Sequence, residues 1–205
     1  MQLHKPDVVD AATAILDNYG IADLTMRRLA RELSVSPGAL YWHFANKQEL
    51  LGAVADRILQ PVRTEGAATA WPSRIHQTCV ALRDALLSHT DGAELVSSSF
   101  AAGKSQTVGA IVGQLADAAK QAGVMSPDDE LAARTVLYYV LGFTADEQSR
   151  LQWDAAGALA DEQSVLDRDT SRQFAFGLQL LVDGLAVRGA STLGSGRDIP
   201  QRSQG

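Results

Sequence analysis

This chain of 205 residues has little cysteine, no long apolar run and no opening segment of the signal type. Its single cysteine, Cys79, excludes an internal disulfide framework and any cysteine-based zinc site. The uncharged apolar run from Thr135 to Ala145 is too short to span a bilayer. No charged-then-apolar segment opens the chain. We therefore expect a soluble, cytoplasmic protein with no membrane partner.

The motifs of the common enzyme classes are absent as well. The chain has no nucleotide-binding glycine loop, no His-Glu-x-x-His spacing and no nucleophile elbow. His76 and His89 have no clustered carboxylate partner, and Cys79 lies among apolar residues, which is typical of an inert core thiol. We predict no catalytic residue, no metal site and no cofactor, so an all-α enzyme is the least favoured alternative.

What the sequence does have is the pattern of a folded helical protein. It is 46% hydrophobic, which is typical of a globular chain. Helical periodicity predicts an all-α fold with an N-terminal domain over residues 1–62 and a larger domain over residues 71–188. The small, polar residues 63–70 mark the junction between them. Residues 189–205, rich in Gly, Ser, Gln and Arg, predict a flexible tail.

The most informative stretch runs from Leu24 to Leu50. Thr25 can cap a helix that continues to about Leu33, and Ser34-Val35 forms a turn. Ser36 then caps a short helix that begins at Pro37, where a missing N–H costs nothing, and ends near Phe44. Asn46 caps a connecting helix over about residues 46–60, with Glu49 placed to return a capping-box bond. This order predicts a helix-turn-helix.

The charge of this stretch differs from that of the whole chain. The chain has a net charge of −6, which argues against indiscriminate coating of nucleic acid. Between Leu24 and Lys47, however, four basic residues (Arg27, Arg28, Arg31 and Lys47) stand against one acid, Glu32, a local charge of +3. Such a local patch is what binding to phosphates requires.

These residues resemble a known family. Three groups of residues resemble the DNA-binding domain of TetR-family bacterial repressors. They are Thr25 with Arg28-Leu29-Ala30, the string Leu40-Tyr41-Trp42-His43-Phe44, and Asn46-Lys47 with Leu50. The resemblance implies a homodimer whose two reading helices bind the half-sites of a palindromic double-stranded DNA operator. It also implies a C-terminal domain that binds a small ligand and dimerises. A helix-turn-helix shape that serves packing alone is the alternative.

The resemblance assigns roles to individual residues. Arg27 matches the position at which arginine reaches a base edge, and a guanidinium pairs well with guanine. Pro37, Gly38 and Ala39 lie at the leading end of the reading helix, where contacts depend on shape or meet a thymine methyl. The remaining candidates match positions that bind the DNA backbone or add charge beside it: Thr25, Arg28, Tyr41, Trp42, His43 and Lys47. Partial core packing is the alternative for Tyr41 and Trp42, and simple solvation for Arg28 and Arg31.

The C-terminal half predicts further helices. They cover about residues 73–88, 91–97, 104–122, 128–150 and 171–188, with Asp91 and Ser126 as caps and a soft segment at 97–103. Five acids against one base predict an exposed loop at 154–169. The string Leu86 to Ala93 resembles the tetracycline-repressor branch of the family. The helices 128–150 and 171–188 carry more apolar surface than one domain needs, and the resemblance implies that they pair with their copies in a second subunit. The core of a monomer is the alternative.

The expected ligand differs from that of the tetracycline repressors. The histidine that ligates magnesium in those proteins falls at Val96, which cannot bind a metal. The family's acidic position falls near Asp146 or Glu147. We expect a more apolar effector in a pocket lined by Leu82, Phe100, Gln114, Tyr138, Tyr139 and Phe143. The same residues could serve as ordinary core, and a DNA-binding regulator without a small ligand remains the alternative function.

Overall fold

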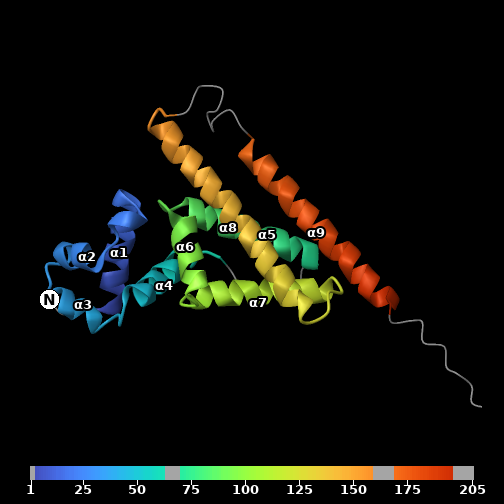
Figure 1. Cartoon of the computed structure of the whole chain (residues 1–205), viewed down its shortest axis with the longest axis horizontal. Helices are drawn as coiled ribbons and strands as arrows, with labels where there is room; N and C mark the ends of the chain where they lie inside the picture. Colours follow the sequence, from blue (N-terminus) through green and yellow to red (C-terminus); the bar gives the residue numbers. More distant parts are fainter. Residues whose placement is uncertain (1–2, 63–69, 159–168, 196–205) are drawn as a thin grey trace, which may run out of the picture.

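The computed structural model describes residues 3–62, 70–158 and 169–195. Within these ranges the chain is helical, apart from turns and short connections, and the predicted all-α fold is confirmed (Figure 1). The elements are α1 (Lys5–Tyr19), the 3-10 turn η1 (Ile21–Asp23), α2 (Met26–Glu32), α3 (Pro37–Tyr41), α4 (Lys47–Ile58), α5 (Trp71–Leu87), α6 (Gly92–Ala101), α7 (Gln106–Gln121), α8 (Asp128–Ala155) and α9 (Thr170–Ser195). None of the helices in the described ranges has the length and apolar composition needed to cross a membrane.

The N-terminal helix starts follow the predicted capping chemistry. The Thr25 hydroxyl accepts from the Arg28 N–H at 3.1 Å, and the Ser36 hydroxyl accepts from the Ala39 N–H at 3.3 Å. The Asn46 amide oxygen accepts from the Glu49 N–H at 2.9 Å. The return bond from Glu49 goes to the N–H of Ala45 rather than to that of Asn46 itself.

Two predicted caps in the second half are wrong. Asp91 precedes α6 but has a left-handed backbone (φ 53°), and its side chain makes no cap bond. Its carboxylate is used instead by the backbone N–H of Ile21, far away in sequence. The helix α8 begins after Pro127, and Ser126 does not cap it.

The later helices are longer than predicted. The soft segment expected at residues 97–103 is helical through Ala101, and α8 continues to Ala155. The expected tail is helical from residue 189 to Ser195, because α9 packs against the end of α7: a Cβ on Gly189 would lie 1.8 Å from the Ala122 carbonyl oxygen. Residues 196–205, most of the predicted acidic loop and the predicted domain junction lie outside the described ranges.

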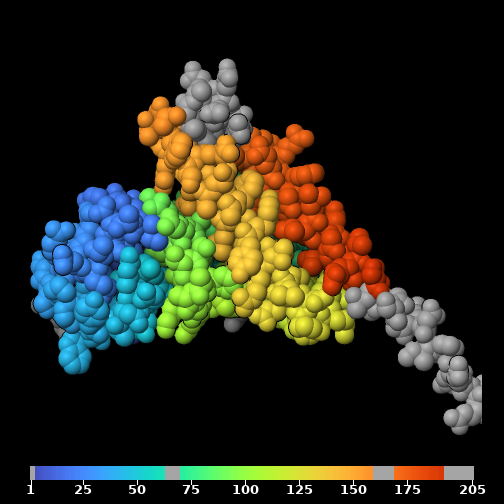
Figure 2. Space-filling view, in the orientation of Figure 1, coloured from blue at the N-terminus to red at the C-terminus, as the bar shows by residue number. Residues whose placement is uncertain are grey.

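The helices form a small head and a larger body. The head comprises α1, α2, α3 and α4, and its core is built from apolar side chains such as Leu16, Leu29, Leu40, Leu50 and Val54. In the body, α8 packs against α5, α6, α7 and α9, as its nearly all-round apolar sequence predicts. Figure 2 shows the head joined to the body along α4 and α6.

The outer surface of α8 and α9 keeps large apolar side chains exposed. They are Leu131, Tyr138, Leu151, Trp153, Phe176, Leu180 and Val187. Phe174 and Leu178 instead face the core of the same subunit. Two glycines of α9 have different surroundings: a Cβ on Gly177 would lie 2.4 Å from the Tyr139 hydroxyl of the same chain, whereas Gly184 faces open space.

A buried ion pair crosses the centre of the body. Arg83 on α5 donates two hydrogen bonds to the carboxylate of Glu147 on α8, at 2.8 and 2.6 Å. The guanidinium also lies over the ring of Phe174 on α9, 5.1 Å from its centroid. Both charged residues are more than nine-tenths buried. The pair therefore joins three helices, and neither charge can return to water without opening the core.

This pair makes a stability prediction. We expect Glu147→Ala to lower the free energy of unfolding by about 3–5 kcal/mol, because it leaves the Arg83 guanidinium buried without its counter-ion. Replacing both partners by apolar residues, Arg83→Met with Glu147→Leu, should recover most of the loss. Glu130→Ala, which breaks the exposed pair with Arg134, is the control and should change stability far less. Urea unfolding measures all three, and equal losses for Glu147→Ala and Glu130→Ala would contradict the assignment.

Candidate functional site

The helix-turn-helix is built from α2, the turn after it and α3. Leu29 and Leu40 are fully buried and fix the two helices on the rest of the head. The turn passes through Ser34, whose backbone is left-handed (φ 55°), and the Val35 N–H bonds to the Ala30 carbonyl at 2.9 Å. The helix α3 ends at Tyr41, earlier than the predicted end near Phe44. The caps therefore orient α3 with its first turn toward solvent.

Most residues predicted to contact DNA lie on the exposed side of this motif. Trp42 is 90% exposed and Tyr41 is 52% exposed, so neither serves mainly as core. Thr25, Arg27, Pro37 and Gly38 are exposed, and Ala39, His43 and Lys47 are half-buried. A side chain as large as that of Trp42 is costly to leave in water, and this exposure is typical of a contact surface.

Arg28 differs from the other cations. Its guanidinium pairs with Asp23 of η1 at 2.5 Å and lies over the Tyr19 ring of α1, 3.7 Å from the centroid. It thus ties α2 to the two preceding elements. The sequence offered a weak signal, since Asp23 is five residues away, but the Tyr19 contact depends on the fold.

The other basic residues of the motif remain available. Arg27, Arg31 and Lys47 have no ion-pair partner among the described residues. Lys47 is also the first residue of α4, so it lies beside free backbone N–H groups and the positive end of a helix dipole. The motif therefore combines basic side chains that are not used in ion pairs among the described residues with a helix N-terminus, and this combination suits binding to phosphates.

The six residues predicted to bind an effector fall into separate groups. Phe100 and Tyr138 pair edge to face across α6 and α8, with ring centroids 5.9 Å apart. Tyr139 and Phe143 instead pack against Phe174 of α9, at 5.6 and 5.3 Å. Leu82 is buried, and Gln114 is half-buried on α7. Tyr139 and Phe143 therefore contribute to the ordinary core between α8 and α9.

The tyrosine in this cluster is held in its neutral form. The Tyr139 hydroxyl donates to the Phe174 carbonyl oxygen at 2.8 Å. Burial raises the pKa of Tyr139, because the phenolate would lose its hydration. The group acts as a hydrogen-bond donor that locks α9 onto α8.

Several buried polar atoms in the body have no hydrogen-bond partner among the residues that the structure describes. They are the Ser99 and Thr144 hydroxyls, the Gln114 amide oxygen, and Nε and Nη2 of Arg74. Ser99 and Thr144 are almost completely buried. An unpartnered buried polar atom costs about 1–3 kcal/mol, so natural proteins rarely keep one without a function. Of these residues, sequence reasoning identified only Gln114, because an isolated Ser, Thr or Arg on a helix is a common surface residue.

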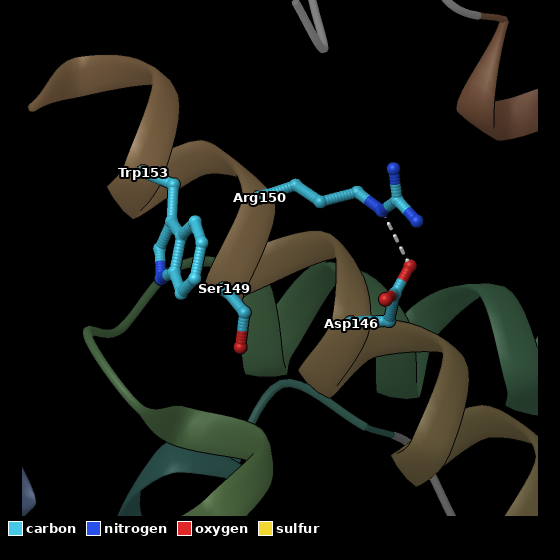
Figure 3. Close-up of a pocket in the computed structure, with 4 residues that line it drawn as sticks. All are labelled: Asp146, Ser149, Arg150 and Trp153. Carbon is cyan, nitrogen blue, oxygen red and sulfur yellow. Dashed lines mark hydrogen bonds and ion pairs between the residues drawn. The ribbon is translucent and has the colours of Figure 1, made fainter. Parts of the chain in front are cut away.

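The surface of α8 is hollowed in two places. Asp146, Ser149, Arg150 and Trp153 line an open hollow of about 270 Å³, in which Arg150 donates to Asp146 at 2.8 Å (Figure 3). A second hollow, of about 410 Å³, lies between α6 and α8 beside Tyr138 and Gly142. Of the two candidates for an acidic ligand contact, Asp146 is thus at the surface and Glu147 is in the buried ion pair.

Two family models match this chain. Residues 8–54 match the model described as bacterial regulatory proteins of the tetR family, and residues 65–168 match the tetracyclin repressor-like C-terminal domain. The first match covers the head through most of α4. The second covers the body through α8.

Individual relatives agree with these models. The tetracycline repressor protein class E of Escherichia coli is 30% identical over 199 residues, which is 91% of this chain and 92% of that protein. The crystal structure of Mycobacterium smegmatis BioQ is similar with a TM-score of 0.85 and 71% identity, covering 92% of this chain and 100% of that one. A structure of BioQ with its natural double-stranded DNA operator has a TM-score of 0.79 and 68% identity, covering 90% and 99% of the two chains.

The Arg28 contacts generate a prediction for the head. Arg28→Met should lower the free energy of unfolding by about 1 kcal/mol, because it removes an ion pair and a cation–π contact. Arg31→Met removes an equal charge from the same helix, where it has no ion-pair partner among the described residues, and should leave stability nearly unchanged. Thermal unfolding followed by circular dichroism compares the two. Equal effects would show that Arg28 has no structural role.

Proposed function

Because the chain belongs to the TetR family of DNA-binding transcriptional regulators, we propose that it is a repressor that binds a palindromic operator as a homodimer and is released by a small-molecule ligand. The observation that carries this proposal is the surface of the helix-turn-helix, which combines an exposed tryptophan with three basic side chains that have no ion-pair partner among the described residues. The related BioQ, crystallised with its operator, supports the same mode of binding here.

On DNA, each residue of this surface has a distinct task. Arg27 reaches a base edge in the major groove, and a bidentate contact with guanine is the natural partner of its guanidinium. The small side chains of Gly38 and Ala39 let the start of α3 approach the bases. The residues that bind phosphates and fix the register are Thr25, Tyr41, Trp42, His43 and Lys47. Arg28 contributes charge beside them while it holds α2 in place.

The homodimer forms through α8 and α9. Phe176, Leu180 and Val187 give α9 an outward apolar stripe, and Leu131 and Tyr138 continue it on α8. Gly142 and Gly184 have open space in front of them, so a second helix can approach closely at both. A monomer would expose this whole surface to water, whereas two copies related by a two-fold axis bury it.

The ligand binds inside the body, among the buried polar atoms that have no partner. Ser99, Gln114 and Thr144 come from three different helices and supply hydroxyl and amide groups to a ligand with polar substituents. Leu82 and Phe100 supply apolar area, whereas Tyr138 is 57% exposed and belongs to the outward apolar stripe. Release of DNA requires that the ligand bind more tightly to a body conformation in which the heads do not fit the operator. A ligand with equal affinity for this conformation and for the DNA-binding one would not shift the equilibrium between them.

Selection of duplexes from a random pool, followed by footprinting at two salt concentrations, tests the proposal. An inverted repeat should be enriched. Affinity should also fall steeply as the salt concentration rises, because the basic side chains release counter-ions from the phosphates when the protein binds. A pool without any enriched sequence, and binding that stays weak at low salt, would refute the DNA-binding role.

Two substitutions separate base reading from phosphate binding. Arg27→Ala should relax one position in each half-site and cost about 1–3 kcal/mol of binding to the selected operator. Lys47→Ala should weaken binding to all sequences alike and reduce the salt slope by about one per subunit. Affinities for the operator and for random duplex at several salt concentrations measure both effects. The assignment of Arg27 fails if its loss weakens every sequence equally.

A matched pair on α9 tests the dimer. Phe176→Arg places a charge within the apolar stripe and should convert the dimer to monomers, because the charge cannot be buried unpaired. Ala175→Arg adds the same charge at the neighbouring exposed position, about 100° around the helix, and should leave the dimer intact. Light scattering after gel filtration gives the mass of each. If both variants remain dimeric, the subunits associate through another surface.

A further inference from the structure

The loop between α5 and α6 contacts both the head and the body. At its end, the carboxylate of Asp91 accepts from the Ile21 N–H of η1 at 2.9 Å through one oxygen. Through the other oxygen it accepts from the side-chain amide of Gln152 on α8, at 2.7 Å. One carboxylate thus bridges the junction of α1 with η1 and the C-terminal part of α8.

A second glutamine holds the loop on the body. The side-chain amide of Gln148, which is buried, donates to the carbonyl oxygens of Leu86 at 2.9 Å and His89 at 2.7 Å. Its oxygen accepts from the Ala93 N–H at 3.1 Å. All three bonds of this amide go to the backbone at the two ends of the loop. The loop therefore moves with α8 as one unit.

The head is shaped to receive this carboxylate. Gly20 has a positive φ of 79°, and a Cβ at that position would lie 2.7 Å from the Asp91 carboxylate oxygen. Any other residue there would push the carboxylate away from the Ile21 N–H. Next to it, the Thr90 hydroxyl donates to the Asp17 carbonyl oxygen at 2.9 Å, and the His89 ring lies 3.0 Å from the Asp17 carboxylate. The contact between this loop and the head thus consists of several polar interactions, and Gly20 leaves the space that the Asp91 carboxylate needs.

The body holds the head at a second, separate place. Asp56 of α4 accepts from the Ser105 hydroxyl at 2.6 Å and from the Thr107 N–H at 2.9 Å, at the start of α7. Gly52 allows close contact there, since a Cβ would lie 2.3 Å from the Lys104 carbonyl oxygen. A head attached through α4 alone could turn about that attachment. The Asp91 contact joins η1 and α8 rather than α4 and α7, so it opposes this rotation.

We propose that Asp91 is a positioning residue that fixes the orientation of the head relative to α8 and thereby sets the half-site spacing that the dimer accepts. This inference rests on the proposed homodimeric function, because α8 is one of the two helices through which we propose that the two copies associate. A carboxylate that bonds α8 and the head at once transmits the position of α8 directly to the reading helix. The residue touches no DNA and acts only through the geometry of the head.

The test uses the selected operator and versions in which one or two base pairs are added to or removed from its centre. Each base pair rotates one half-site by about 35° relative to the other, so a rigid dimer should bind the native spacing at least about tenfold better than the altered ones. Gln152→Glu places two carboxylates face to face and should break the contact between Asp91 and α8. Because Gln152 is exposed, the fold should survive. The preference for native spacing should then fall at least about fivefold, a coupling of ordinary size for communicating sites.

Exchanging the carboxylate at position 91 with the amide at position 152 should restore the contact. In the double variant Asp91→Asn with Gln152→Glu, the amide at position 91 accepts from the Ile21 N–H through its oxygen and donates through its nitrogen to the carboxylate at position 152. An asparagine also tolerates the left-handed backbone of this position. We expect the spacing preference to return to within about twofold of that of the wild type, a difference well below a typical coupling between sites. Gln121→Glu makes the same charge change at an exposed site on α7 and should leave the preference unchanged.

The outcomes separate the inference from the proposed function. If Gln152→Glu weakens binding at every spacing by the same factor, or the double variant restores nothing, Asp91 does not set the spacing. If the wild-type chain binds no operator at any spacing, the proposed function itself fails, and the inference fails with it.

Discussion

The structure depends on the burial of one helix on several sides. Between Val136 and Phe143 the helix α8 is apolar around most of its circumference, and α5, α6, α7 and α9 pack around it. The pair of Arg83 with Glu147 makes this packing specific, because both charges lose their hydration and each must meet the other in one register. The helices of one subunit still leave a strip of α8 and α9 uncovered, and this strip is the basis of the proposed dimer.

The head of the protein was largely predictable from the sequence, and the physical reason is locality. Thr25, Ser36 and Asn46 bond to N–H groups three residues away, so the sequence alone indicates where the three helices begin. The exposure of Trp42 also follows from a motif in neighbouring residues. The end of α9 was not predictable in this way, because the contact of Gly189 with the end of α7 joins segments that are far apart in the sequence.

The sites that depend on distant residues could not be found from the sequence. Asp91 has the pattern of a helix cap, yet its partners are Ile21 and Gln152, which lie 70 positions before it and 61 after it. Glu147 was recognised as an acidic position, but nothing local indicates that Arg83 neutralises it. The same limit applies to the proposed ligand site, since only the folded body shows that the buried Ser99 and Thr144 hydroxyls have no hydrogen-bond partner among the described residues. Local chemistry thus identifies the DNA-reading head, whereas its coupling to the body resides in long-range polar contacts.

The central claim is that two copies of this chain read one palindromic duplex. Native mass spectrometry of the full chain mixed with its selected operator tests this most directly, because it counts the molecules in the complex. We expect one species that contains two chains and one duplex, and loss of that species when one half-site is scrambled. A complex of one chain with one duplex, unaffected by scrambling the second half-site, would contradict it.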